Sequence, residues 1–562
     1  MARFMMSGLF VRYATMFTQR CVSLLGTILQ TPIYRSAIYI LVVSLLYLPK
    51  GFAGAALPAR AWICLGTMLS IGGIALYHLP QLAKARSWFS RYGLGLILVS
   101  NVLVIFSAVL YVAFAFHRFI PWVDAAKFAQ SLWRILQGEG LEPVLGREFP
   151  PPTHVSPTLL LLLPLYALSP SVLTLGVIRT MLIAASSVVL YAVARISLKK
   201  DIAALLALAY LFNFPIIFQM TVEGFCETQL FPLLFLLACW YFERQRYVGW
   251  LVTLFLIGGI REEMGAVLLG FAVFAFLRGR HWRYWLGAGL LGICWLAFSY
   301  GFILGVWKGK YLFYYVFATD TTKSGFSRIF NWQNLVLLYH LGLPFVFILP
   351  FLGWSSLPVA PILIGCLYAQ YSIAKAPFLH YNLPIVVGFS YATVRHLSLM
   401  GSRMVQKHGD ALVVTLALMM LTLSVTRTIE HVPYEFSLHL PIGGTLGLPI
   451  NQDSRILQDS EAFKRWITSL QEASKQVPRG SQASVPPHVV AHVCYQHKPL
   501  DYQYMDLESL PDYVLLDDNL TWNPERMERQ HKWKHGLGQR YRVVYNENGV
   551  ALFRRYGSER SQ

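Results

Sequence analysis

The sequence predicts an α-helical polytopic membrane protein that ends in a small α/β domain. Of its 562 residues, 56% are hydrophobic and only 13% are charged, whereas a soluble protein carries about 25% charged residues. Apolar runs close to membrane-spanning length recur between Ser36 and Val425. After about residue 431 the chain becomes charged and shows strand-like alternation. These observations exclude a single soluble domain.

Three domains are expected. Residues 1–90 form an N-terminal extension with two transmembrane helices, residues 91–430 form a transmembrane core with a long first outer loop at 116–156, and residues 431–562 form an extracytoplasmic α/β domain. About thirteen helices are predicted to cross the membrane. They lie near 37–56, 62–79, 93–115, 157–196, 202–219, 228–242, 248–260, 264–277, 284–305, 333–350, 354–372, 381–397 and 411–427.

Basic residues predict the orientation of these helices. With the N-terminus inside, nearly every cluster of Lys and Arg falls in a loop on the cytoplasmic side. The C-terminal domain is then extracytoplasmic. The short basic loops also account for the net charge of +19, and because no basic stripe with interleaved aromatics stands outside the membrane, we expect no nucleic-acid partner. The sequence therefore predicts a multi-pass protein of an inner or plasma membrane.

Two segments depart from simple crossings. The runs 248–260 and 264–277 are short for full crossings, and basic loops at both ends predict a hairpin whose tip, Arg261-Glu262-Glu263, lies at or within the outer leaflet. The run 157–196 is too long and contains Pro164 and Pro170. We therefore expect a short half-helix there, followed by one crossing.

The C-terminal domain shows ordinary secondary-structure patterns but no catalytic motif. We predict an amphipathic helix at Asp459–Val477, a strand at Tyr513–Leu516 and a β-hairpin at Tyr541–Phe553. No phosphate loop, dinucleotide fingerprint or nucleophile elbow is present. The seven cysteines form no framework, so neither disulfides nor a zinc site is expected. The sequence predicts no metal ligand and no certain cofactor, and it leaves the use of a divalent metal open.

Acidic residues concentrate on one side of the predicted membrane core. None occurs before Asp124, and nine of the twelve up to residue 427 map to the outer side. Carboxylates close to apolar spans are costly and tend to line water-filled cavities or sites. Asp124 and Glu262 are the strongest candidates, since each lies close to apolar sequence and beside aromatics or an arginine. The nine are Asp124, Glu139, Glu142, Glu148, Glu223, Glu227, Glu262, Glu263 and Asp320.

The first outer loop begins directly after a predicted span. Its early part, from Trp122 to Trp133, has the period of an amphipathic helix that lies on the membrane surface. Its last part contains His154. That histidine fits either a hydrogen-bonding loop residue or a group that contacts substrate.

Four short blocks of residues stand at characteristic spacings. The first is Asp124, Phe128, Gln130 and Trp133; the second is His154, Ser156, Pro157, Pro164 and Tyr166; the third is Arg261, Glu262 and Glu263; the fourth is His380, Tyr381 and Pro384. A fifth, Glu223 to Glu227, fits only loosely, since Cys226 stands where a histidine is expected.

With these blocks, residues 90–560 resemble a bacterial domain-of-unknown-function family of predicted polytopic membrane proteins related to the GT-C glycosyltransferases. The resemblance implies a GT-C-like transmembrane fold in a bacterial inner membrane. It implies transfer of a sugar from a polyprenyl-phosphate donor to an acceptor on the extracytoplasmic face. It places the catalytic carboxylate at Asp124, with Glu262 as a second catalytic acid. The substrate-binding residues are then expected among His154, Glu223, Glu227, Arg261, Glu263, His380 and Tyr381.

A leaving polyprenyl phosphate needs cations at its oxygens. Lys308, Lys310 and Arg328 supply them in an outer loop, against the usual charge bias. The same residues also fit a solvated loop that contacts lipid headgroups.

Two other classes of function stay open. One is a transporter or flippase of a polar or lipid-linked substrate, a class that often shows inverted repeats and broken helices. The sequence shows no clear repeat, and its acids gather at one face, which favours the enzyme. The other is a non-catalytic membrane scaffold, because a fold does not imply a function.

Overall fold

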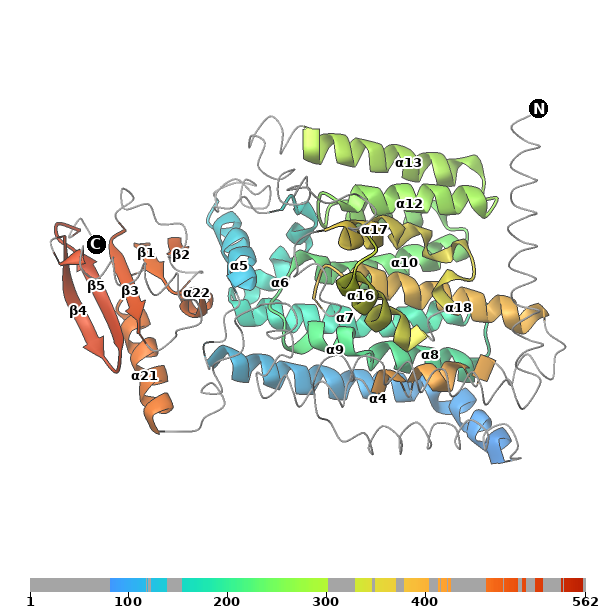
Figure 1. Cartoon of the computed structure of the whole chain (residues 1–562), viewed down its shortest axis with the longest axis horizontal. Coiled ribbons are helices and arrows are strands. Elements are labelled where there is room, and N and C mark those ends of the chain that lie inside the picture. The colour runs from blue at the N-terminus through green and yellow to red at the C-terminus, as the bar shows by residue number, and fades with distance from the viewer. Residues whose placement is uncertain are drawn as a thin grey trace. The chain divides into compact units, whose positions relative to one another are not determined.

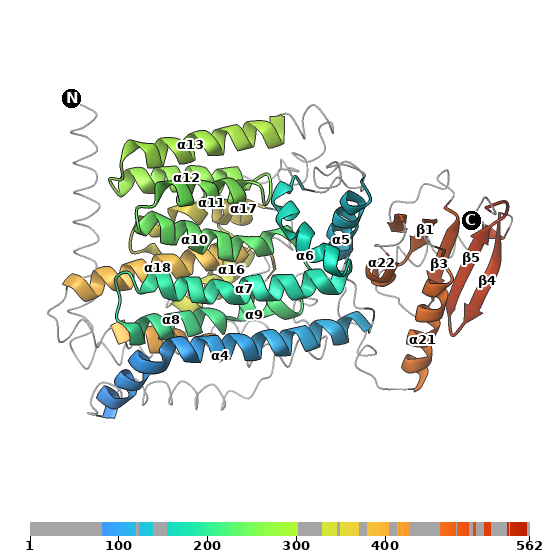
Figure 2. The same ribbon diagram turned by 180° about the vertical axis from the view of Figure 1, so that it is seen from behind.

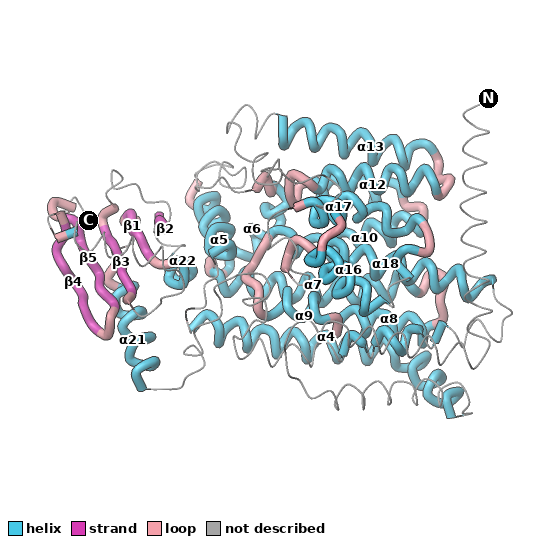
Figure 3. Tube along the Cα trace, viewed as in Figure 1, coloured by secondary structure: helices cyan, strands magenta, loops and turns pink. Residues whose placement is uncertain are grey.

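The protein is described by a computed structural model that is mostly helical, with strands only near the C-terminus (Figure 3). The described residues are 81–117, 119, 123–138, 154–301, 329–345, 349–369, 379–403, 413–414, 416–421, 423–425, 461–478, 480–493, 498–501, 511–518, 537–538 and 540–558. The two spans predicted at 37–56 and 62–79 lie outside them.

The chain divides into two compact units, each assembled from separate stretches of sequence. The first unit contains Met1–Val104, Leu182–Ile217 and Leu230–Ile429, and the second contains Ile105–Met181, Phe218–Gln229 and Glu430–Gln562. Each unit is described by itself.

Helices make up the described part of the first unit (Figures 1 and 2). It holds the start of α4 (Gln81–His117), the end of α7 (Val172–Ala194), α8 (Lys200–Leu211), the start of α9 (Phe214–Thr221), α10 (Phe231–Glu243), α11 (Tyr247–Gly258), α12 (Met264–Leu277), α13 (Trp282–Leu296), α16 (Trp332–Gly342), α17 (Ala360–Tyr368) and α18 (Leu383–Arg403). Short 3-10 helices join them: η4 (Leu343–Phe345), η5 (Leu349–Phe351) and η6 (Trp354–Val359).

Among the described residues, four helices are long and apolar enough to cross a membrane: Ser87–His117, Val172–Ala194, Trp282–Gly301 and Leu383–Met400. A fifth span results if α8 and α9, bent by 51° at their junction, count as one. Several shorter apolar helices, α11 and α12 among them, do not reach spanning length. The predicted multi-helix membrane architecture is thus present, while the predicted count of about thirteen is not confirmed.

The predicted hairpin is confirmed. Its arms, α11 and α12, are joined by a tight turn at residues 259–263, and α12 runs alongside α13 in both views (Figures 1 and 2). Glycines allow this close approach: a Cβ on Gly265 would lie 2.6 Å from the Leu296 side chain, and one on Gly292 would lie 2.9 Å from the Gly265 carbonyl oxygen. Small residues at such contacts let helix backbones pack closely in a membrane.

Gly270, in the middle of α12, packs against the backbone of η6. A Cβ there would lie 2.6 Å from the carbonyl oxygen of Leu357 and 2.8 Å from Cα of Pro358. We expect Gly270→Ala to lower the free energy of unfolding by about 1–3 kcal/mol, because backbone atoms have to move. Gly365→Ala, in α17, is the matched control, since a Cβ at that position meets nothing within 4 Å. Thermal unfolding in detergent measures both, and equal midpoints would contradict the packing.

Glu243, at the end of α10, lies at the centre of an ionic cluster. Its side chain is only 5% exposed. Oε1 accepts a hydrogen bond from the Tyr391 hydroxyl at 2.7 Å and lies 3.3 Å from Nε of Arg395, while Oε2 lies 3.7 Å from Nη2 of both Arg278 and Arg280. We call Glu243, Arg278, Arg280 and Arg395 the arginine cluster. It ties the C-terminal ends of α10 and α12 to α18.

The second unit begins with the end of α4 and the amphipathic helix α5 (Val123–Leu136). The half-helix predicted at the start of 157–196 is confirmed as η1 (Pro157–Leu162) and α6 (Leu163–Leu168), and the crossing that follows is α7. Pro157 and Pro164 each stand in the first turn of their helix, where a missing N–H is tolerated. The hydroxyl of Tyr166 donates to the carbonyl of Ala129 at 2.8 Å, which attaches α6 to α5.

The C-terminal part of this unit is a small α/β domain, as predicted. Its sheet has the order β2-β1-β3-β5-β4, parallel on the β2-β1-β3 side and antiparallel on the other. The predicted helix, strand and hairpin are all found. The elements are α21 (Glu461–Lys475), β1 (Gln482–Val485), α22 (Pro487–Val493), β2 (Lys498–Asp501), β3 (Tyr513–Asp517), β4 (Tyr541–Glu547) and β5 (Val550–Arg555).

Local chemistry explains the turn and the core of this domain. Asn548 and Gly549 both have positive φ, 48° and 79°, as a two-residue hairpin turn requires. Trp466 of α21 donates its indole N–H to the buried carboxylate of Asp517, at 3.1 and 3.2 Å. Burial raises the pKa of Tyr541 to about 12, so its hydroxyl stays protonated and donates to the carbonyl of Pro511 at 2.8 Å.

Candidate functional site

Asp124 lies in the first turn of α5. The apolar face of this helix is buried, with Ala125, Ala129 and Leu132 fully covered, while the Asp124 side chain is 56% exposed. Its Oδ1 lies 3.1 Å from Nζ of Lys127, one turn further on. A carboxylate near the N-terminus of a helix also interacts favourably with the helix dipole. Asp124 is thus an accessible acid on a helix held in place by packing.

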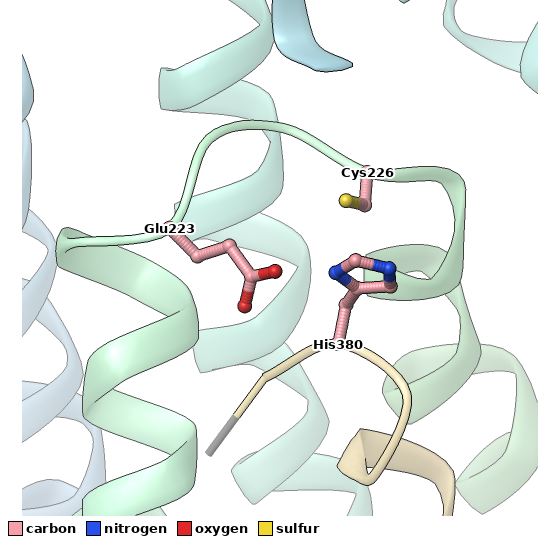
Figure 4. Close-up of side chains that lie close together, drawn as sticks. All are labelled: Glu223, Cys226 and His380. Atoms are coloured by element: carbon pink, nitrogen blue, oxygen red, sulfur yellow. The ribbon is translucent and has the colours of Figure 1, made fainter. Parts of the chain in front are cut away.

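The loop after α9 carries Glu223 and Cys226, the two side chains that Figure 4 shows on the same loop. Gln219 donates its side-chain amide to Oε2 of Glu223. Gln229 donates to Oε1 of Gln219 at 3.1 Å and accepts from the backbone N–H of Cys226 at 3.0 Å. This network of amides holds the loop in one conformation and orients the Glu223 carboxylate.

Arg179 of α7 sits beneath the same loop, 1% exposed. Its Nη2 donates to the carbonyl oxygens of Thr221 at 2.9 Å and Met220 at 3.3 Å, at the C-terminal end of α9. A guanidinium there satisfies carbonyls that lack a partner in the helix and complements its dipole. Its positive charge also acts on Glu223 and Cys226, so it is the local counter-ion of the loop.

The remaining predicted residues of the second unit surround this loop. Glu227 begins η2 (Glu227–Leu230) and is 2% exposed. Phe225 of the loop packs edge-on against Phe128 of α5, with ring centroids 5.8 Å apart. The loop with Glu223 and Glu227 therefore contacts α5, the helix that carries Asp124. His154 is partly buried in the segment before η1.

In the first unit, the tip of the α11–α12 hairpin carries the predicted charges. Glu262 is 1% exposed and Arg261 is 7% exposed. Nε of Arg261 lies 2.8 Å from Oε1 of Glu263, and its guanidinium lies over the Tyr381 ring at 5.3 Å. Of the two adjacent acids, the structure pairs Arg261 with Glu263.

Other helices of the first unit converge on this tip. The indole of Trp295 donates to the carbonyl of Arg261 at 3.1 Å, and Tyr300 lies within electrostatic range of Glu263, Glu262 and Arg261. His380, also labelled in Figure 4, stands next to Tyr381 in the turn before α18, with ring centroids 4.0 Å apart. The predicted residues Arg261, Glu262, Glu263 and Tyr381 thus form one charged cluster, in which Arg261 and Glu262 are buried and Glu263 and Tyr381 are partly exposed, with His380 beside Tyr381.

The arms of the hairpin are short compared with the thickness of a bilayer. Helices of 12 and 14 residues measure about 18 and 21 Å, whereas the hydrocarbon core of a bilayer is about 30 Å thick. If the basic turns at the open end of the hairpin lie at one surface, the tip stops short of the other. Ionisable groups at such a depth mark a functional site by default.

Three predicted donor-binding cations, Lys308, Lys310 and Arg328, lie outside the described residues. Sequence reasoning missed Arg179, Gln219 and Tyr300, which contact or influence the predicted acids. For Arg179 a signal existed, since it is a single arginine within the apolar run 172–194. For Gln219 and Tyr300 the sequence has no comparable signal, because both contacts depend on tertiary packing.

Comparisons with known proteins agree with a membrane protein. A family model described as "Predicted membrane protein (DUF2079)" matches residues 123–552. The chain is similar to the crystal structure of ArnT from Cupriavidus metallidurans bound to undecaprenyl phosphate, with a TM-score of 0.48, 12% identity, and coverage of 81% of this chain and 98% of that chain. The apo state of the same protein matches with a TM-score of 0.46, 12% identity and the same coverage. No curated protein sequence matches.

Proposed function

The chain belongs to the DUF2079 family of predicted membrane proteins, and from this premise we propose that it is a membrane glycosyltransferase. The membership confirms the family predicted from the four sequence blocks. The proposed reaction transfers a sugar from a polyprenyl-phosphate donor to an acceptor hydroxyl on the extracytoplasmic face. The division into extension, transmembrane core and C-terminal domain belongs to the same proposal.

The observation that supports it best is the placement of Asp124. Its carboxylate is more than half exposed and pairs with Lys127 one turn away, while the helix beneath it is firmly packed. A general base must reach the proton it removes while its own position stays fixed. Asp124 meets both conditions.

In the proposed reaction, Asp124 takes the proton of the acceptor hydroxyl. The acceptor oxygen then bonds to the anomeric carbon, and the bond between that carbon and the phosphate oxygen breaks. The electron pair leaves with the polyprenyl phosphate, whose growing negative charge needs cations close by. Arg261 is such a cation among the described residues, and Lys308, Lys310 and Arg328 are the others we propose.

The buried acids have supporting roles in this proposal. Glu262, 1% exposed at the hairpin tip, is the second catalytic acid. Glu223, Glu227 and His154 bind sugar hydroxyls, and Glu263, His380 and Tyr381 hold the hairpin side of the donor. Carboxylates suit sugar hydroxyls because each accepts several hydrogen bonds.

A donor-cleavage assay tests the proposal. The full-length protein is placed in vesicles with polyprenyl-phosphate hexoses that carry a labelled sugar. We expect protein-dependent release of free polyprenyl phosphate together with a labelled water-soluble or acceptor-bound sugar. Movement of intact donor across the bilayer without cleavage would contradict it and establish the flippase. Binding of donor with neither movement nor cleavage would establish the scaffold.

A further inference from the structure

The arginine cluster of the first unit has an excess of positive charge. Three guanidinium groups surround the single carboxylate of Glu243. The side chains of Arg278, Arg280 and Arg395 are 26%, 15% and 12% exposed. Charges this far from water are costly unless they are paired. Two positive charges in the cluster have no matching negative charge among its members.

The ion pairs of the cluster are long. Its nitrogen–oxygen distances of 3.3 to 3.7 Å exceed the roughly 2.7–2.9 Å of a charge-assisted hydrogen bond. Among the described residues, the buried Nε of Arg280 has no hydrogen-bond partner, and the buried Nε of Arg395 meets Oε1 of Glu243 as an ion pair at 3.3 Å without forming a hydrogen bond. A buried donor without an acceptor costs about 1–3 kcal/mol. An additional anion would remove that cost.

The surroundings place the cluster at the headgroup level of a bilayer. Trp282 and Trp285, in the first turns of α13, are 52% and 36% exposed, as interfacial tryptophans are. The neighbouring turn between α10 and α11 carries exposed Arg244 and Arg246. Next to Arg278 on α12, the apolar side chains of Phe276 and Val273 are 49% and 50% exposed.

We propose that the arginine cluster binds the phosphate of an anionic phospholipid. The phosphodiester supplies the missing negative charge and the acceptor oxygens, and Arg278, the most exposed member, is the point of entry. The acyl chains then cover the exposed apolar side chains of α12. A basic pocket between helix ends is a recognised type of lipid-headgroup site. A free phosphate shares the headgroup chemistry but gains nothing from the apolar surface.

Lipid-dependent stability and lipid retention test this site. The full-length protein is placed in nanodiscs of phosphatidylcholine, with or without phosphatidylglycerol, and its unfolding midpoint is measured; native mass spectrometry counts the phosphatidylglycerol retained. We expect phosphatidylglycerol to raise the midpoint. At about 1 kcal/mol for each arginine near a phosphate, Arg278→Gln/Arg280→Gln should bind it about 30-fold more weakly.

Two further variants keep the test decisive. Arg278→Gln alone serves if the double variant fails to fold, because two arginines still face Glu243. Arg283→Gln is the control, since this exposed arginine lies at the same end of the bundle outside the cluster, and it should retain the lipid. Equal stabilisation by inorganic phosphate in phosphatidylcholine nanodiscs would overturn the lipid assignment. The assignment would also be overturned if phosphatidylglycerol failed to raise the unfolding midpoint, or if it raised the midpoint equally in the cluster variants.

Discussion

Asp124→Asn should abolish most sugar transfer while leaving a folded protein. Asparagine keeps the size of the side chain and part of its hydrogen bonding but cannot accept the acceptor's proton. Loss of a general base typically lowers the rate by roughly 10²–10⁴-fold. Because Asp124 is 56% exposed and its partner Lys127 is only one turn away, the substitution removes no buried ion pair. The unfolding midpoint and donor affinity should therefore stay close to those of the unmodified protein.

The measurement is the rate of transfer at saturating donor. Lys127→Gln is the matched control, since it removes the same ion pair but keeps the base. An exposed ion pair contributes up to about 1 kcal/mol, so the transfer rate of Lys127→Gln should fall by less than about fivefold. Near-normal transfer by a well-folded Asp124→Asn protein would exclude the role and turn attention to Glu223, Glu227 and Glu262.

Glu243→Gln should cause the largest loss of stability. Glutamine still accepts the Tyr391 hydrogen bond, but it leaves three partly buried arginines with no negative charge within the cluster. Removal of one partner from a buried ionic group costs about 3–5 kcal/mol. Unfolding in a zwitterionic detergent free of anionic lipid measures the effect without a compensating anion.

The C-terminal domain offers the control for this loss. Glu461 forms an ion pair of 3.1 Å with Lys464, but its side chain is 79% exposed. Glu461→Gln should therefore change the free energy of unfolding by less than about 1 kcal/mol. Similar losses in the two variants would show that the arginine cluster is solvated, against its burial in the structure.

Much of the secondary structure followed from local patterns. The hairpin of α11 and α12 was predictable because two short apolar runs lie between basic turns. The half-helix before α7 was predictable from its prolines. In the C-terminal domain, the turn at Asn548 and Gly549 identified the β4–β5 hairpin, while β1, β2 and α22 went unpredicted. These elements are only four to seven residues long and too short to show a period.

What escaped prediction depends on contacts between distant residues. Asp201 and Glu243 lie just outside the predicted spans 202–219 and 228–242, yet both belong to helices in the structure and their side chains are largely buried. The bend between α8 and α9 falls at Asn213 inside an apolar run that reads as one helix. At the candidate sites, the acids and Arg261 stood out by their charge, but the amides that orient Glu223 did not. Glutamine is common on helices, and only the fold brings Gln219 and Gln229 together.

The shortness of the α11–α12 hairpin constrains how the chain is inserted during synthesis. Neither arm, with 12 or 14 residues, is long enough to be released into lipid as an independent segment. Each charge at the tip would also cost the insertion machinery about 2.5–3.5 kcal/mol. The glycine surface of α13 that receives the hairpin is translated after it. We therefore expect the two arms to enter the bilayer together, as a pair, after α13 has emerged.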